Sequence, residues 1–534
     1  MQNSGHRFGC PSPKKCYICT MFVRKKKNPS GVVSIQIIDK NSGKYRVIKT
    51  IGSSKESAEV LNLYNEGKKW IASRTGVRDM FLLEEQQREE KQVADYLLGN
   101  IENILLNGTQ LIFNPVFHLV GFDVIEDDIL KQLAIARLCQ PSSKVATADY
   151  LKSHFDEDVE LHQLYRYLDR LYDREKEKVE QISVEHTRKV LGGKIGLVFY
   201  DVTTLYFETD IGDHFRIQGF SKDGKHSQPQ IILGLLVSAG GYPLAYTVDK
   251  GNKYEGHTML PVVEEFVRKF DLHDFIVVAD SGLMNNENIE LMEAKGYQYI
   301  LGARIKNETN AIKAWILSVE KTDGTFYECQ KNETTRLIIG YCEKRAGKDA
   351  YNREKGIKRL EKEYKNGLIT KDKINKRGYN KFLEFCDDIT VHINYDKVSE
   401  DEKWDGLKGY ITNTKLPAQT VYEEYSGLWQ VERAFRVTKG TLELRPMFHF
   451  TQKRIEAHIC ICFVAYKVYK ELERILKLSE INLSVDKVLT IAKTITTLKI
   501  KLPISGETIS KTMLLTPKHK TIARLFEPNF WENF

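Results

Sequence analysis

The hydrophobic pattern of the chain changes character twice along its length. Apolar and polar positions alternate over residues 32–39 and again over residues 44–51, which predicts a β-hairpin. The alternate positions of these strands are basic or polar, which suits a sheet that contacts an anionic partner. From residue 54 to about residue 191 the apolar spacing becomes helical. The predicted helices lie near residues 56–75, 84–106, 123–138, 144–154 and 160–190.

The pattern changes again near Gly193, where short apolar runs replace the helical spacing. The run at 195–200 predicts a strand that ends at Asp201, and residues 203–207 look like its partner strand. Further strands are predicted at 230–238, 243–249, 275–279 and 297–301, with helices near 257–270 and 285–295. This order predicts a mixed α/β sheet with helices around it.

Residues 303–405 interrupt this pattern with a segment dense in lysine and arginine, which is typical of a solvated helix between strands. An apolar helix near 452–476 and a basic C-terminal region follow. Seven segments are therefore predicted. They are an extension at 1–20, a β-hairpin module at 21–55, a largely helical region at 56–191, the first part of an α/β core at 192–302, an α+β insertion domain at 303–405, the second part of the core at 406–450, and a helical C-terminal region at 451–534.

One segment in the second part of the core joins helical spacing to an unusual set of polar residues. Apolar residues recur at helical spacing through residues 425–439, which predicts one continuous helix. On this helix Tyr425, Glu432 and Lys439 are separated by two turns each and project from one side. A carboxylate between a phenol and an ammonium suits a metal ion and a phosphodiester better than it suits a core.

Two aspartates share a setting that strengthens this interpretation. Asp201 and Asp280 each follow a buried apolar run, and ligands collect at strand ends of α/β sheets. An ionised aspartate is rarely buried unless it is paired or coordinates a metal. Together with Glu432, they form a set of three carboxylates, which can hold two Mg²⁺ ions about 3.5–4 Å apart for phosphoryl transfer. A single such aspartate would more often be a turn or cap residue.

Charge and hydropathy narrow the class of protein. The net charge is +8 and the isoelectric point is about 8.7, which is compatible with a nucleic-acid partner. The apolar part of the longest uncharged run, Ile231 to Val248, is long enough for a membrane span. However, Gly240-Gly241-Tyr242-Pro243 divides it, which predicts two buried strands joined by a hairpin turn. Polar residues follow Met1, so no signal peptide, no membrane contact and a cytoplasmic location are expected.

The nine cysteines show no spacing typical of a disulfide framework, and most are expected to be reduced and buried. The N-terminal group is different. His6, Cys10, Cys16 and Cys19 have the residue types of a four-ligand zinc site. The alternative is that residues 1–20 are a disordered extension that precedes the folded protein at Met21.

Several short motifs occur in order along the chain. They include Tyr-Asp-Val-Thr-Thr-Leu-Tyr-Phe at 200–207 and further motifs at 251–255, 279–282, 432–436, 444–446 and 454–458. In combination they resemble bacterial insertion-sequence transposases of the DDE type, in the insertion-sequence-four-like group with a Tyr-x2-Arg-x3-Glu-x6-Lys signature. The likeness covers most of the chain from Met21 on. It implies a ribonuclease H-like core with Asp201, Asp280 and Glu432 as the catalytic and metal-binding triad.

The resemblance also implies contacts with DNA. Tyr425 and Lys439 would bind phosphate oxygens near the cleavage site. Part of the basic insertion would also contact DNA, with an ordinary solvated face as the alternative. The arginine position of the signature holds Leu428 in this chain, so Arg433 or Arg436 would supply that phosphate contact instead.

Trp429 has two interpretations. Some relatives use an aromatic residue near this place to receive a flipped base at the transposon end. The alternative is packing in the core at the base of the helix.

The leading hypothesis is therefore a transposase of the bacterial cytoplasm, associated with the nucleoid. It would bind the terminal inverted repeats of its element as double-stranded DNA, through the N-terminal hairpin and the helical region. It would nick them with two Mg²⁺ ions, for which Mn²⁺ can substitute, and transfer the 3′-hydroxyl ends to target DNA as a homodimer in the synaptic complex. Two alternatives stay open, a catalytically silent DNA-binding protein derived from a transposon and a metal-dependent nuclease without strand transfer.

Overall fold

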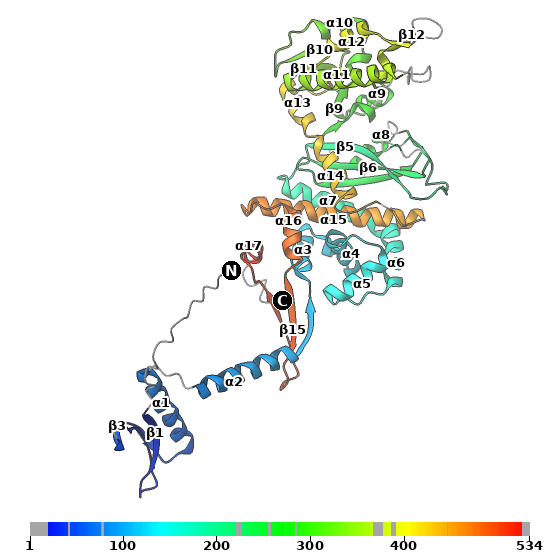
Figure 1. The fold of residues 1–534 in the computed structure, drawn as a ribbon. Helices are drawn as coiled ribbons and strands as arrows, with labels where there is room; N and C mark the ends of the chain where they lie inside the picture. The colour runs from blue at the N-terminus through cyan, green and yellow to red at the C-terminus, as the bar shows by residue number, and fades with distance from the viewer. Residues whose placement is uncertain are drawn as a thin grey trace, which may run out of the picture. The chain divides into compact units, whose positions relative to one another are not determined.

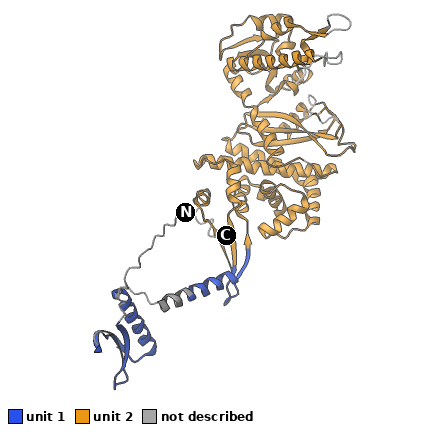
Figure 2. Cartoon of the chain, viewed as in Figure 1, with its two compact units in different colours: residues 1–103, 500–509 blue, residues 104–499, 510–534 orange. Residues whose placement is uncertain are grey.

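The computed structural model describes residues 20–40, 43–75, 80–220, 224, 227–254, 258–272, 274–283, 286–366, 378–385, 391–445 and 447–525. The zinc candidates His6, Cys10, Cys16 and Cys19 lie outside these residues. The chain divides into two compact units, residues 1–103 with 500–509 and residues 104–499 with 510–534 (Figure 1, Figure 2). The helices predicted near 56–75 and 84–106 thus group with the N-terminal hairpin.

The first unit contains a three-stranded antiparallel sheet in the order β1-β2-β3. Its strands are Met21–Lys27, Val33–Asp39 and Arg46–Ser54, so the predicted hairpin is confirmed. A register shift between Ile37 and Ile38 interrupts the alternation, and both side chains are buried. Helix α1 (Ser57–Thr75) packs on β2 and β3, and α2 (Met80–Gly99) follows it.

The second unit is built on an eight-stranded mixed sheet, which confirms the predicted α/β architecture of the core. The strand order is β10-β11-β14-β9-β8-β5-β6-β7. Strands β5, β8 and β9 are parallel, and the other neighbours are antiparallel. The strands are β5 (Leu197–Tyr206), β6 (Gln230–Ser238), β7 (Pro243–Lys250), β8 (Ile276–Ala279), β9 (Gln298–Ala303), β10 (Phe326–Gln330), β11 (Arg336–Tyr341) and β14 (Leu407–Thr412).

The partner strand expected at residues 203–207 is wrong. Residues 203–206 continue β5, which pairs with β6 without interruption from Val198 to Tyr206. Asp201 therefore lies within β5 and does not end it. The pairing of its backbone with β6 does not depend on the nature of its side chain. The apolar run from Ile231 forms most of β6 and β7, as predicted, and no helix in the described part of the chain has the length and hydrophobicity to cross a membrane.

The sheet separates two hydrophobic clusters. One contains residues of β5, β6 and β8 together with α14 (Trp429–Lys439) and α15 (Gln452–Leu478). The other contains the opposite faces of these strands together with α8 (Met259–Phe270) and α9 (Asn286–Ala294). Helices thus cover both faces of the sheet (Figure 1).

The helical region after the first unit packs largely against α15. Its helices are α3 (Gly108–Val120), α4 (Asp128–Cys139), α5 (Lys144–Tyr150), α6 (Leu161–Arg170) and α7 (Lys176–Val190). Helix α3 was missed by the spacing analysis, and the helix predicted to reach residue 106 ends at Gly99, where β4 (Ile101–Leu105) soon begins.

The C-terminal region is not wholly helical, which corrects the prediction for 451–534. After α15 and α16 (Val485–Ala492), the chain forms β15 (Thr496–Lys501) and β16 (Thr508–Met513) before α17 (Pro517–Ala523). Polar residues alternate along these strands, so they do not stand out as apolar runs in the sequence.

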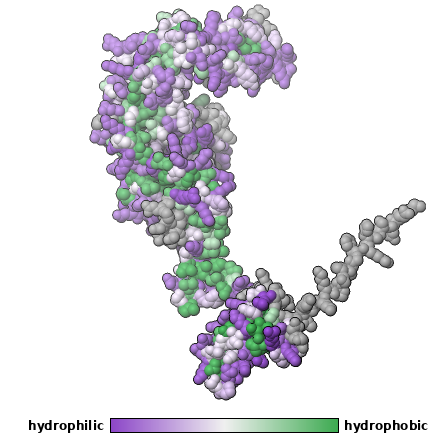
Figure 3. All heavy atoms as spheres, turned by 90° about the vertical axis from the view of Figure 1, so that its left-hand side faces the viewer, coloured by the Kyte–Doolittle hydropathy of each residue, from purple (hydrophilic) through white to green (hydrophobic). Residues whose placement is uncertain are grey.

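The predicted insertion contributes two strands, β10 and β11, to the large sheet. Its other elements are α10 (Asn310–Ser318), α11 (Glu343–Lys365), β12 (Leu383–Phe385), β13 (Val391–Ile393) and α12 (Tyr395–Glu402). Figure 3 shows a mainly hydrophilic surface at the upper end of the drawn face, where Figure 1 places these elements. The basic segment is therefore largely exposed, and its contact with DNA stays a prediction.

A buried amine joins the helical region to α15. Lys144 at the start of α5 is 4% exposed, and its Nζ lies 3.4 Å from Nδ1 of His458. Burial, together with the positive charge of Arg137, lowers the pKa of Lys144 to about 7. The folded protein therefore resists protonation of an amine that the unfolded chain protonates freely.

We expect Lys144→Met to stabilise the protein in a pH-dependent way. The folded pKa lies below the unfolded pKa, so the penalty is complete below about pH 7 and fades as the pH rises toward the unfolded value. The gain in unfolding free energy should be larger by a few kcal/mol at about pH 6 than at about pH 10, since one pKa unit is worth about 1.4 kcal/mol. Urea unfolding at both pH values measures it. Lys189→Met, near the end of α7, is the control, and an equal gain at both pH values for Lys144→Met would contradict the prediction.

Candidate active site

Two predicted site residues lie close together on adjacent parallel strands, Asp201 within β5 and Asp280 directly after β8. Tyr200 of β5 is in register with Ala279 of β8. Asp201 and Asp280 are the next residues along the chain from this pair, so the register brings them to neighbouring positions. The Oδ1 atom of Asp201 accepts a hydrogen bond from the backbone N–H of Val202 at 2.8 Å.

Both aspartates belong to the same face of the sheet. Asp201 lies two positions after Phe199, and Asp280 lies two positions after Val278. Side chains two apart on a strand share a face. Phe199 and Val278 belong to the hydrophobic cluster that also contains Val431 of α14, and α14 packs on β5 and β6. The aspartates therefore project toward the layer that carries Glu432.

The continuous helix predicted over residues 425–439 is wrong. Helix α13 (Ala418–Ser426) ends before Gly427, and α14 begins at Trp429. A Cβ atom on Gly427 would lie 2.5 Å from the ring of Phe199, so the break fits a close approach that only glycine allows. The apolar periodicity persists across the break, which is why spacing alone did not reveal it.

Tyr425, at the end of α13, holds the second aspartate. Its hydroxyl donates a hydrogen bond to Oδ1 of Asp280 at 3.1 Å. The residue is only 5% exposed, and its ring packs on Tyr410. Burial and the nearby charge of Asp280 raise the pKa of Tyr425 above its ordinary value, so the phenol remains protonated and donates. Tyr425 thus positions a carboxylate through its hydroxyl.

Glu432 is exposed on α14, and a lysine links it electrostatically to Asp280. Lys408 of β14 is partly buried, with Nζ 4.4 Å from the centre of the Tyr425 ring. Burial and then the charge of Arg345 lower the pKa of Lys408, while the charges of Asp280 and Glu432 oppose that shift. The two carboxylates therefore act on the same ammonium group.

The other residues of α14 that were predicted to contact DNA differ in whether their side chains already have a partner within the protein. Lys439 donates a hydrogen bond to the hydroxyl of Thr203, two residues after Asp201 on β5. Arg433 forms an ion pair with Glu473, whereas Arg436 is exposed. Arg436 is therefore the better placed of the two arginines for a contact outside the protein.

Trp429 and Leu428 have opposite surroundings. Trp429 has 54% of its surface exposed, so core packing does not account for it. Leu428, where the signature has arginine, is buried at 8% exposure in the break between α13 and α14. The Leu428 side chain belongs to the hydrophobic cluster, which explains why an apolar residue suits this position.

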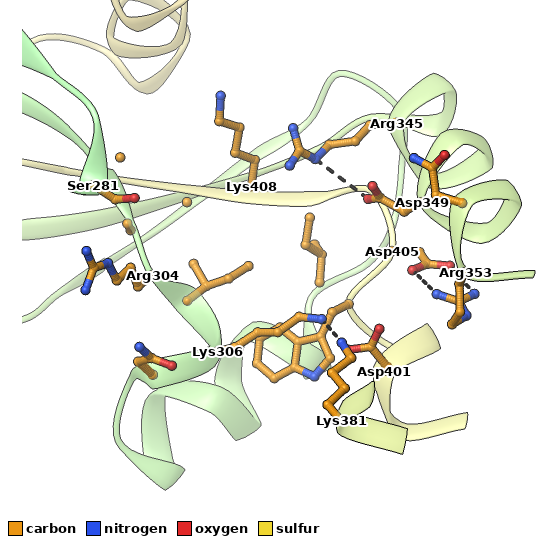
Figure 4. A pocket seen from close by; sticks show the side chains of 18 of the residues that line it. Ser281, Arg304, Lys306, Arg345, Asp349, Arg353, Lys381, Asp401, Asp405 and Lys408 are labelled. Carbon is orange, nitrogen blue, oxygen red and sulfur yellow. Dashed lines mark hydrogen bonds and ion pairs between the residues drawn. The ribbon is translucent and has the colours of Figure 1, made fainter. Parts of the chain in front are cut away.

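A cavity of about 750 Å³ opens from this edge of the sheet toward α11 (Figure 4). Asp280, Gly302 and Tyr425 line one end of it, and Arg345 and Arg353 of α11 line another part. Arginine and lysine side chains make most of its charged lining, which suits an anionic ligand.

The carboxylates fit a divalent cation by their chemistry. Hard oxygen donors from two aspartates and a glutamate are what Mg²⁺ prefers, with waters and phosphate oxygens completing its shell. Among the described residues, however, no group of three or more histidine, cysteine, aspartate or glutamate side chains is spaced to hold a metal ion. The residues therefore fit a metal site whose coordination is completed by oxygen atoms of the substrate, and they do not form a complete set of protein ligands.

Sequence reasoning missed three residues of this site, which are Arg304, Lys408 and Gly302. Their only sequence signal is the appearance of charged or small residues at the ends of apolar strands. A Cβ atom on Gly302 would lie 2.6 Å from Oη of Tyr425 and 3.3 Å from Oδ1 of Asp280. Such proximity depends on strand pairing and leaves no trace in local spacing.

Comparisons with known proteins identify the middle of the chain. A family model described as a transposase DDE domain matches residues 192–467. One similar solved structure is the piggyBac transposase synaptic complex with hairpin DNA, which is 9% identical, with 73% of this chain and 79% of that chain covered and a TM-score of 0.38. Another is the Mos1 transposase paired-end complex with left transposon end, at 9% identity, 32% and 58% coverage and a TM-score of 0.15. No curated protein matches the chain.

Proposed function

Because the chain belongs to the family of transposases with a DDE domain, we propose that it cuts and joins DNA at the ends of its own mobile element, with Asp201, Asp280 and Glu432 as the catalytic carboxylates. The observation that carries this assignment is the register of β5 and β8, which makes Asp201 and Asp280 neighbours on the face covered by α14. All three residues lie within the matched segment, and the mixed sheet fits a ribonuclease H-like core.

The three carboxylates would hold the divalent cations, and Tyr425 would keep Asp280 in place for this task. Two Mg²⁺ ions, or Mn²⁺ in their place, would supply activation of the attacking water or 3′-hydroxyl and stabilisation of the leaving oxygen. Lys439, held at Thr203, would contact a phosphate oxygen beside Asp201.

Further contacts with the DNA end are part of this proposal. Exposed Trp429 offers a surface on which a displaced base could stack, and exposed Arg436 offers a charge for a phosphate. Arg433 would act indirectly, by fixing α14 to Glu473 of α15. Because Leu428 is buried, another residue would have to supply the phosphate contact that the signature assigns to arginine at this position.

The partners proposed are double-stranded transposon ends, target DNA and a second copy of the chain in the synaptic complex. The N-terminal sheet, whose strands carry Lys25, Lys26 and Lys27, and the helical region would recognise the inverted repeats. The chain would act in the bacterial cytoplasm at the nucleoid.

We expect the purified chain to nick and join a duplex that carries the terminal inverted repeats found beside its gene. Mg²⁺ or Mn²⁺ should support both steps, and a chelator should stop both, because the carboxylates need a cation to bring phosphate oxygens near them. Gel separation of nicked, cut and joined products measures the result, and a duplex with scrambled ends is the control. Nicking without joining would favour the nuclease, and end binding without either step would favour the silent DNA-binding protein.

A further inference from the structure

Two cations, Arg304 and Lys408, line the same cavity as Asp280. In the antiparallel pairing of β14 with β9, Gly409 is in register with Ala303. Lys408 comes directly before Gly409 on β14, and Arg304 comes directly after Ala303, just past the end of β9, so both residues lie at the same end of this pairing. Figure 4 shows both side chains at the same end of the cavity as Ser281, which follows Asp280 in the chain.

The other cations of the cavity are held by acidic partners. Lys306 and Lys381 each contact Oδ1 of Asp401, at 2.6 and 2.7 Å. Arg353 pairs with Asp405 at 2.6 Å. Each of these cations therefore already has an acidic partner within the protein, although the two lysines share one carboxylate.

The other arginine of α11 that lines the cavity, Arg345, is paired more loosely, at 3.7 Å from Asp349. By contrast, Arg304 and Lys408 take part in no ion pair among the residues that the structure describes. The positive charge that is available to a ligand is therefore concentrated at the end of the cavity beside the carboxylates.

The setting of Lys408 restricts what it can bind. The Tyr425 ring lies against its ammonium group, and Tyr425 itself donates to Asp280. The charges of Asp280 and Glu432 both interact with the Lys408 ammonium group, but Lys408 forms an ion pair with neither carboxylate. A partly buried cation is stabilised most when an anionic ligand binds directly beside it in the cavity. A phosphate is such an anion, and lysine binds it as a point charge while arginine binds it through a fork of donors.

We propose that Arg304 and Lys408 each bind a backbone phosphate of the DNA strand next to the scissile phosphate, and that this strand continues into the cavity toward α11. This inference rests on the proposed function. It supplies the positive charge that Leu428 does not provide, from two strands that the catalytic motif does not include. Both residues are positioning residues, since they fix the strand relative to the carboxylates.

The salt dependence of DNA binding tests this proposal in the full chain. Each phosphate contact contributes about 0.9 to the slope of log K against log salt concentration. Arg304→Gln and Lys408→Gln should each reduce the slope by about 1 and weaken binding to end-containing duplex about tenfold at moderate salt. Lys408→Arg should keep most of the slope. The control is Lys306→Gln, in the same cavity, whose charge is already paired and whose slope should stay unchanged.

Chemically modified DNA locates the contact. A neutral methylphosphonate is placed at each position beside the cut in turn. The modification at the phosphate that Lys408 contacts should weaken wild-type binding about tenfold. At that position Lys408→Gln should lose nothing further, because the contact is already gone. A merely structural defect would weaken binding equally at every position, and circular dichroism with a melting curve checks that the variant is folded.

The outcomes separate this inference from the function on which it rests. If wild type neither binds nor nicks transposon ends, the proposed function fails. If wild type does both and the two variants keep its salt slope, only the phosphate site is overturned. If the variants lose binding of inorganic phosphate but keep the DNA slope and the interference pattern, the cavity takes free phosphate and the strand assignment is wrong.

Discussion

The Asp280→Asn and Glu432→Gln variants should each lose DNA nicking by about 10³-fold or more, which corresponds to roughly 4 kcal/mol of transition-state stabilisation. Asp280 at the end of β8 and Glu432 on α14 are both exposed, so a neutral isostere removes charge without leaving a hole in the core. In the Asp280→Asn variant, the amide oxygen of the new side chain can still accept the hydrogen bond from the Tyr425 hydroxyl, which keeps the local geometry. The loss therefore reports the missing negative charge.

Binding and stability distinguish this effect from misfolding. Both variants should bind end-containing duplex at least as tightly as wild type, because removing a carboxylate reduces repulsion of phosphate. Glu423→Gln, at an exposed position on neighbouring α13, is the matched control and should nick normally. Nicking by either Asp280→Asn or Glu432→Gln at the wild-type rate would remove that residue from the triad. Asp201→Asn should behave like them, since asparagine can also accept the N–H of Val202.

Much of the core was predictable because its strands are continuous apolar runs. Strands β6, β7, β8 and β9 and helix α15 lie where hydrophobic spacing places them. Buried strands in a sheet that is covered on both faces read in this way, with turn residues between them. Asp280 directly follows such a run, so its position at the sheet edge was correctly predicted.

The errors arose where tertiary contacts decide the local structure. Asp201 looked like the end of a strand, yet pairing with β6 extends β5 further, to Tyr206. The break lies at Gly427, where a Cβ atom would strike the ring of Phe199, a residue far away in sequence. Lys408 reaches the site because β14 pairs with β9 across the insertion, and no local pattern records that pairing. Contacts between distant segments were therefore the missing information.

A single methyl group at Gly302 should impair the site nearly as severely as loss of a carboxylate. The Cβ atom of Gly302→Ala would lie 2.6 Å from Oη of Tyr425, closer than side-chain carbons are found, and 3.3 Å from Oδ1 of Asp280. The Tyr425 ring is buried against Tyr410, so it can move away only by disturbing the hydrogen bond to Asp280. A displacement of about 1 Å at a reacting group can cost about 10²-fold in rate.

A second substitution shows whether this effect passes through Tyr425. Tyr425→Phe removes the oxygen that the new methyl group would strike, so Gly302→Ala should cost less nicking activity in that background than in wild type. The double-mutant cycle measures this coupling as a departure from additivity. Gly340→Ala is the matched control, because its Cβ atom would lie 2.7 Å from the ring of Phe326, which belongs to the edge strand β10. It should lower stability by a similar amount and leave nicking per folded molecule intact. Equal losses of nicking in Gly302→Ala and Gly340→Ala would mean that sheet strain, and not the position of Tyr425, limits the reaction.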